Sequence, residues 1–258
     1  MFCAIFTSGK QGMETDNMVW TVLGGWAVPP IVLENIFGKN SNYIDINPLM
    51  PSLFDKDTLA PDWIQRLKNI LEPRLSMPLY LAGWSTGALL SLALASVLNP
   101  VILVLLSPTH SFCRRNNFRF GTRRSVLELM RTSLAVDREN VLKGFYTRCG
   151  MDGELHSVPY STDELEAGLL FLEQAAFSTE YLLTLGSLPF QKLVFHGSRD
   201  LIIPCEAGEY LCSAIDGSFH KYDGPHLFFD KYHKEIKSAI DSRLKRGYPN
   251  AVNISQSI

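Results

Sequence analysis

Short apolar runs alternate along the chain with stretches that have helical spacing. A run without polar interruptions is typical of a parallel strand covered on both faces, and alternation with helices is typical of βα units. Strands are expected within residues 18–23, 41–46, 77–82, 100–108, 191–200 and 218–223, and helices within 31–37 and 61–71 and after residue 86. The pattern predicts an α/β fold with a mostly parallel central sheet flanked by helices.

Gly83, Ser85 and Gly87 stand where the apolar run at 77–82 gives way to a helix that is apolar on nearly all sides. The spacing G-x-S-x-G at such a junction is typical of a nucleophile elbow, a sharp turn that exposes a serine hydroxyl above the sheet and tolerates no side chain next to it. The alternative is an ordinary strand-to-helix connection with a serine N-cap. We expect Ser85 to be a nucleophile.

A serine nucleophile needs a base and an acid that orients the base. Asp200 is expected in the polar turn after a late strand, and His226 in the loop after a Gly-Pro break. His226 would take the Ser85 proton and return it to the leaving group, while Asp200 would fix the tautomer of the ring. Asp223 and Asp230 are weaker candidates for the acid, because residues so close to His226 in a tight loop rarely reach the far ring nitrogen. Three other histidines have weaker claims, since they fall within strands or on the closing helix: His196, His220 and His233.

Two glycines, Gly24 and Gly25, end the first predicted strand and precede Trp26. Such a loop at the mouth of the sheet can turn a peptide N–H inward, and the residue after the nucleophile supplies a second donor. The backbone amides of Trp26 and Thr86 are therefore the expected oxyanion donors. Trp26 and Trp84 are also candidates to touch substrate, with packing as the alternative role, and a plain turn is the alternative for the two glycines.

These residues together resemble the α/β-hydrolase family, whose members share the chain order serine, acid, histidine. Gly-Trp-Ser-x-Gly at 83–87, with Gly25-Trp26 before it, is similar to the carboxylesterases of biotin synthesis that cleave pimeloyl-acyl carrier protein methyl ester. Many of these relatives begin the oxyanion loop with His-Gly, where this chain has Leu23-Gly24. The resemblance implies a cofactor-independent ester hydrolase that forms an acyl-enzyme on Ser85 and releases methanol from a carrier-linked dicarboxylate methyl ester.

Two other kinds of function remain open at this point. An acyl thioesterase, or a short-chain carboxylesterase of another pathway, would need the same triad and the same oxyanion donors. A non-catalytic binding module with a hydrolase-like fold is the third possibility. A complete set of Ser85, Asp200 and His226 argues against the binding module, because such a module would be free to lose any of the three.

The alternation of strands and helices stops between the fourth and fifth predicted strands. The intervening segment is helical in pattern with few strand signals, and it is expected to form a cap over the active site. The sequence therefore predicts a hydrolase core made of residues 16–108 and 190–247, a helical cap at 109–189, and poorly ordered ends at 1–15 and 248–258.

The first half of the cap is rich in arginine and its second half in acidic residues. An arginine-rich surface suits an acidic partner, and acyl carrier protein is acidic and carries a phosphate that arginine binds well. Arg123, Arg124 and Arg131 are the candidates for carrier docking. The alternative is that these arginines are solvated or paired with the acidic half of the cap itself.

Composition sets the outer limits of the function. The net charge is −2, no stretch approaches the ~20 apolar residues of a membrane span, and the start lacks the basic, long apolar pattern of a signal peptide. We expect a cytoplasmic monomer that uses no cofactor or metal and binds neither nucleic acid nor membrane. The cysteines form no C-x-x-C pair and are expected to be free thiols: Cys3, Cys113, Cys149, Cys205 and Cys212.

Overall fold

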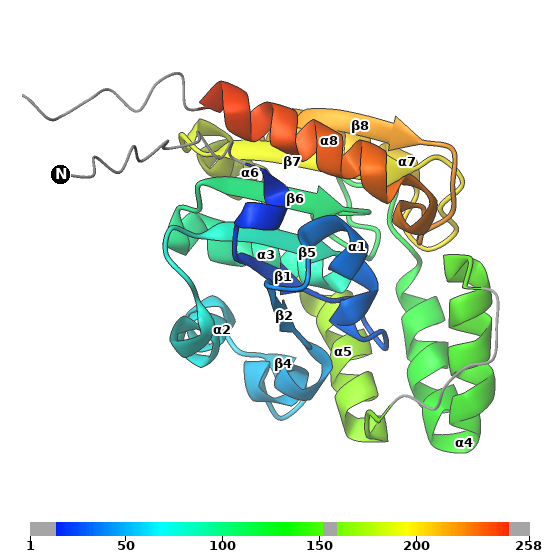
Figure 1. Ribbon diagram of the computed structural model, residues 1–258. Helices are drawn as coiled ribbons and strands as arrows, with labels where there is room; N and C mark the ends of the chain where they lie inside the picture. The colour runs from blue at the N-terminus through cyan, green and yellow to red at the C-terminus, as the bar shows by residue number, and fades with distance from the viewer. Residues whose placement is uncertain (1–13, 152–158, 248–258) are drawn as a thin grey trace, which may run out of the picture.

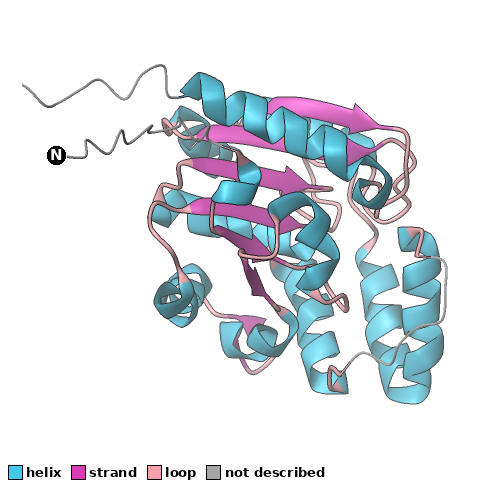
Figure 2. Cartoon of the chain, in the orientation of Figure 1, coloured by secondary structure: helices cyan, strands magenta, loops and turns pink. Residues whose placement is uncertain are grey.

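The computed structural model describes residues 14–151 and 159–247. Cys3 and nearly all of both ends that were expected to be poorly ordered lie outside the described residues. Six strands form one parallel sheet in the order β2-β1-β5-β6-β7-β8 (Figures 1 and 2). These strands are β1 (Trp20–Leu23), β2 (Asn42–Ile44), β5 (Tyr80–Trp84), β6 (Ile102–Leu106), β7 (Gln191–Gly197) and β8 (Ser218–Tyr222). The predicted α/β fold with a parallel sheet is confirmed.

The register of the central strands brings their carboxyl ends to one edge. Gly83 on β5 pairs with Leu23 on β1 and with Leu105 on β6. The loops that follow these three strands therefore leave the sheet side by side, and a residue in each loop can face the same space. A short antiparallel hairpin, β3 (Phe54–Asp55) with β4 (Thr58–Leu59), was not predicted, because two residues per strand leave no apolar period to detect.

Helices cover both faces of the sheet. On one face α1 (Glu34–Phe37) packs with α8 (Phe229–Gly247), which crosses in front of β7 and β8 in Figure 1. The elbow helix α3 (Thr86–Leu98) lies on the other face and is buried from Thr86 to Ala95, which explains why its sequence is apolar all round. The remaining helices of the core are α2 (Trp63–Leu71), α7 (Cys205–Ala214) and the 3₁₀ helices η1 (Thr15–Asn17), η2 (Pro30–Leu33), η3 (Asn47–Leu53) and η4 (Glu72–Arg74).

Three helices lie between β6 and β7 along the chain: α4 (Arg124–Cys149), α5 (Thr162–Gln174) and α6 (Thr179–Ser187). The first two pack together beyond the carboxyl ends of the strands (Figure 1), and α4 is kinked at Asp137, whose backbone leaves the helical region. The third helix packs on the core, because the Tyr181 hydroxyl on α6 donates to the Leu92 carbonyl of α3. The cap boundary at residue 189 stays a prediction, and these contacts favour an earlier one.

No helix in the described ranges is long and apolar enough to cross a membrane. The described cysteines are free and buried, as expected: Cys113, Cys149, Cys205 and Cys212.

Candidate active site

Ser85 occupies the sharp turn between β5 and α3. Its φ of 56° and ψ of −117° lie outside the regions that a residue with a side chain normally adopts. Such a conformation costs about 1–3 kcal/mol and persists only where the surrounding structure determines it. The strained turn at the end of a buried strand has the geometry of a nucleophile elbow.

The two glycines of the elbow leave room for neighbouring backbone. A Cβ atom on Gly83 would overlap the carbonyl oxygen of Gly87, and a Cβ atom on Gly87 would overlap the carbonyl oxygens of Leu23 and Gly24. Both contacts are with backbone, which cannot move aside as a flexible side chain can. The G-x-S-x-G spacing is thus what allows the elbow to sit directly against the loop that follows β1.

Asp200 and His226 meet behind the elbow. Asp200 follows β7 and His226 follows β8, and the His226 Nδ1 lies 2.6 Å from Asp200 Oδ2, with both side chains fully buried. The other carboxylate oxygen, Oδ1, accepts hydrogen bonds of 2.8 Å from the backbone amides of Ile202 and Ile203. These three contacts fix the plane of the carboxylate and the orientation of the His226 ring.

A second buried histidine touches the same carboxylate. His196 Nε2 lies 2.9 Å from the Ile203 carbonyl oxygen and 3.3 Å from Asp200 Oδ2. Burial alone would raise the pKa of the Asp200 carboxyl, but His226 and His196 outweigh it and hold that pKa below its usual value. His196 was not expected to take part in the site because it lies within a strand. The strand ends at Gly197, so this histidine sits at the edge where the site forms.

The Nε2 atom of His226 has no hydrogen-bond partner among the described residues, although it is buried. Asp200 engages Nδ1, which leaves Nε2 as the acceptor in the neutral ring. The Ser85 hydroxyl likewise makes no hydrogen bond within the described part of the chain. Catalytic hydrogen bonds are often long before substrate binds, and a serine and a histidine that are both without partners are free to form one.

Trp84 packs against the histidine and does not reach the cavity described below. Its side chain is 0% exposed, and its ring lies 5.2 Å from the His226 ring and 5.2 Å edge-on to Phe229. These contacts favour packing, the alternative role considered for Trp84, while substrate contact by Trp84 stays a prediction. The contact also brings His226 against the residue that precedes Ser85.

The loop after β1 lies on the elbow from the other side. A Cβ atom on Gly25 would come within 3.0 Å of the Trp84 ring and 3.6 Å of the Ser85 Cβ. The backbone of Trp26 follows directly, and neither its amide nor that of Thr86 has an acceptor within the described residues. Two free N–H groups next to a serine suit the negative oxygen of a tetrahedral intermediate.

A cavity opens above Ser85, with Trp26 and Thr86 also in its wall. Its lining is mostly apolar and comes largely from the cap, including Phe112, Val126, Leu127, Met130, Phe145 and Leu172. Arg148, near the end of α4, is the single charged residue in the part of the lining that the structure describes. The cavity thus combines an apolar wall, a nucleophile and one positive charge.

We found no family model that matches the chain. Among curated proteins, the pimeloyl-[acyl-carrier protein] methyl ester esterase of Nitrosomonas europaea is 25% identical over 206 residues, covering 74% of this chain and 80% of that protein. The match covers most of both chains. At this identity the substrate of that protein cannot be assigned to this one.

Solved structures of two esterases and a bromoperoxidase superpose on this chain. An esterase from Exiguobacterium antarcticum does so with a TM-score of 0.64 at 19% identity, and a bromoperoxidase from Bacillus anthracis with 0.61 at 19%, each covering 88% of this chain and 92% of the other. An esterase from Thermogutta terrifontis gives 0.60 at 16%, with coverage of 89% and 92%. The chain is an α/β-hydrolase by fold.

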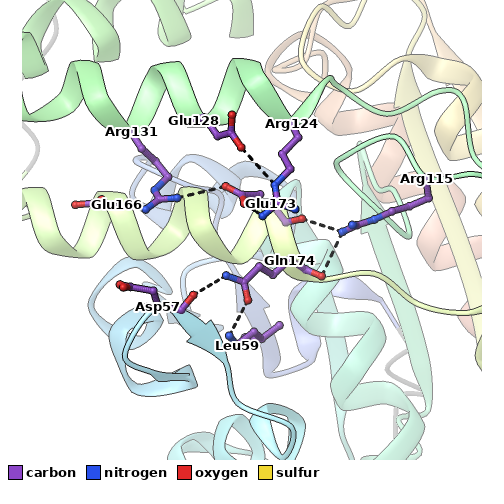
Figure 3. Close-up of polar contacts among 9 residues, drawn as sticks. All are labelled: Asp57, Leu59, Arg115, Arg124, Glu128, Arg131, Glu166, Glu173 and Gln174. Atoms are coloured by element: carbon purple, nitrogen blue, oxygen red, sulfur yellow. Dashed lines mark hydrogen bonds and ion pairs between the residues drawn. The ribbon is translucent and has the colours of Figure 1, made fainter.

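In this chain, two of the three arginines expected to dock a carrier are already paired within the cap (Figure 3). Arg124 pairs with Glu173, and Arg131 lies 3.4 Å from Glu173 and 3.3 Å from Glu166. Glu173 is only 3% exposed, whereas the Arg124 side chain is 62% exposed, so the buried carboxylate is held by one exposed and one half-buried arginine. The alternative considered for these arginines therefore holds for Arg124 and Arg131, while Arg123 is exposed at the start of α4.

No three His, Cys, Asp or Glu side chains gather as a metal site would require, as far as the described ranges extend.

Proposed function

We propose that the protein is a serine carboxylic ester hydrolase with Ser85 as nucleophile, His226 as general base and Asp200 as the acid that orients it. The observation that supports this most strongly is the 2.6 Å contact between Asp200 and His226 beside the strained turn of Ser85. The similarity to a curated esterase and the hydrolase fold point to the same chemistry.

The reaction follows from the roles of these groups. The Ser85 Oγ attacks the ester carbonyl as its proton passes to His226 Nε2, and the amides of Trp26 and Thr86 receive the negative charge on the carbonyl oxygen. Collapse of the tetrahedral intermediate releases the alcohol, which takes the proton from His226. Water then attacks the acyl-enzyme by the same route and frees the acid. Asp200 stays ionised throughout and stabilises the imidazolium.

The proposed substrate is a methyl ester at the far end of a dicarboxylic acyl chain that is linked to acyl carrier protein, as in biotin synthesis. The apolar cavity wall suits the acyl chain, and Arg148 suits an anionic group at its edge. The substrate in the printed name of the Nitrosomonas europaea relative supports the same choice. We propose that the carrier docks on the cap near Arg123. Arg124 and Arg131 would contact the carrier only after they release their present glutamate partners.

Product analysis by mass spectrometry tests the proposal. The purified protein and its Ser85→Ala variant are each given pimeloyl-acyl carrier protein methyl ester. The free ω-carboxylate, still on the carrier, is expected from the wild type alone. Release of the carrier thiol would instead make the enzyme a thioesterase. If the protein cleaves simple short-chain esters but not this substrate, the proposed mechanism stands and the proposed role in biotin synthesis is wrong.

A further inference from the structure

The oxyanion loop contains a strained residue directly after Trp26. Ala27 is completely buried and has a φ of 57°, a left-handed conformation that is unfavourable for a residue with a Cβ atom. Strain of this kind is retained only where neighbouring groups hold it. The groups that hold Ala27 therefore determine the direction of the N–H group of the preceding residue, Trp26.

A buried side chain of the core holds this loop at two points. Asn47, which is 0% exposed, accepts a 2.8 Å hydrogen bond from the Ala27 amide through Oδ1 and donates one of 3.3 Å to the Gly25 carbonyl through Nδ2. The same Nδ2 donates to Asp45 Oδ1 at 2.9 Å, which fixes which end of the amide faces Ala27. Asn47 thus holds the peptide groups on either side of Trp26.

The cap holds the same loop from the opposite side. The Tyr146 hydroxyl, on α4, donates a buried 2.6 Å hydrogen bond to the Ala27 carbonyl. The Trp26 indole Nε1 donates a 2.8 Å bond to the Leu165 carbonyl of α5. Burial raises the pKa of Tyr146 to about 12, so its hydroxyl stays protonated and remains a donor at any working pH. Both peptide ends of Ala27 are therefore bonded, one to the core and one to the cap.

We propose that Asn47 and Tyr146 are positioning residues that hold the Trp26 amide toward Ser85, so that the oxyanion hole is complete only while the cap is seated on the core. This inference rests on the proposed roles of Ser85 and Trp26. It adds that the cap, besides shaping the acyl cavity, supplies one of the contacts on which transition-state stabilisation depends. Displacing the cap from this loop would therefore lower the rate.

Two variants test the proposal in the full-length protein. Tyr146→Phe removes only the hydroxyl, and Asn47→Ala removes the core contact. Each should lower kcat for p-nitrophenyl butyrate by about tenfold or more while KM changes less than twofold, because loss of an oxyanion donor costs 10²–10³-fold and displacement costs somewhat less. A trifluoromethyl ketone, which adds to serine and forms an oxyanion, should bind more weakly by the same factor as kcat/KM falls.

Tyr181→Phe is the matched control, because it also removes a tyrosine hydroxyl that donates to a backbone carbonyl, here that of Leu92, away from the loop. It is expected to change thermal stability without changing kcat. A kcat for Tyr146→Phe within twofold of wild type, or an equal loss in Tyr181→Phe, would overturn the proposal.

Hydrogen exchange separates this inference from the proposed function. Exchange of the Ala27 amide, which is bonded to Asn47, should accelerate in Tyr146→Phe and not in Tyr181→Phe, whether or not the protein hydrolyses any ester. Wild-type protein without Ser85-dependent turnover would contradict the proposed function. Unchanged exchange at the Ala27 amide would contradict the positioning role of Tyr146.

Discussion

At the scale of single residues, Asp200 has the densest set of polar contacts in the site. It contacts two backbone amides and two histidines, and its pKa is lowered despite burial. A carboxyl whose folded pKa lies below the unfolded value of about 3.9 stabilises the fold above that value, and the contribution is lost as the pH falls through the folded pKa. Asp200 is therefore ionised at neutral pH, and its own titration should not limit the activity there.

The elbow glycines lead to a prediction about stability at the same scale. Gly87→Ala places a methyl group on the carbonyl oxygens of Leu23 and Gly24, and should lower the free energy of unfolding by about 1–3 kcal/mol and reduce activity, because the backbone must shift. Urea unfolding and ester hydrolysis measure the two effects. Gly144→Ala is the control: nothing lies within 4 Å of the added atom on α4, so alanine should stabilise the helix by about 0.5–1 kcal/mol. Wild-type stability in Gly87→Ala would mean that the elbow and the oxyanion loop are not in contact.

At the scale of elements, the end of α5 joins the cap to the core (Figure 3). Glu173 is bonded to two arginines of α4, and the next residue, Gln174, bonds the Leu59 amide and the Asp57 carbonyl of the β3–β4 hairpin. Arg115 donates to the Glu173 carbonyl as well. The position of α4 thus depends on Arg124 and Arg131, which were expected to dock a carrier. The pattern of charges along a helix does not reveal which partner a side chain takes.

Arg123 and Arg148, which make no ion pair among the described residues, carry the prediction at this scale. Replacing Arg123 and Arg148 together by alanine should raise KM for a carrier-linked ester by about tenfold, because each removes a charge-assisted contact with an anionic partner. The loss for neutral p-nitrophenyl butyrate should be smaller. Lys143→Ala, also exposed on α4 and outside the cavity lining, is the control. Equal losses on both substrates would contradict anion recognition by these arginines.

At the scale of the whole molecule, the fold was predictable because β5 and β6 are apolar runs and the other strands alternate with helical stretches. The three proposed triad residues were predictable because each follows a predicted strand, and parallel strands end at one edge. His196, Asn47 and Tyr146 could not be found this way. Their partners are a carboxylate or backbone groups brought close only by the tertiary structure, and no local pattern marks them. The end of the cap was hard to predict for a similar reason. The sequence of α6 has a helical pattern whether the helix belongs to the cap or packs on the core.

Labelling with a fluorophosphonate tests the central claim, a nucleophilic Ser85, most directly. Intact-mass analysis and peptide mapping should find one adduct per chain on Ser85 in the wild type, none in Ser85→Ala, and much slower labelling in His226→Ala, because the histidine activates the hydroxyl. No adduct on Ser85 in folded wild-type protein, or an adduct on another residue, would contradict the account and leave a hydrolase fold without the proposed catalytic function.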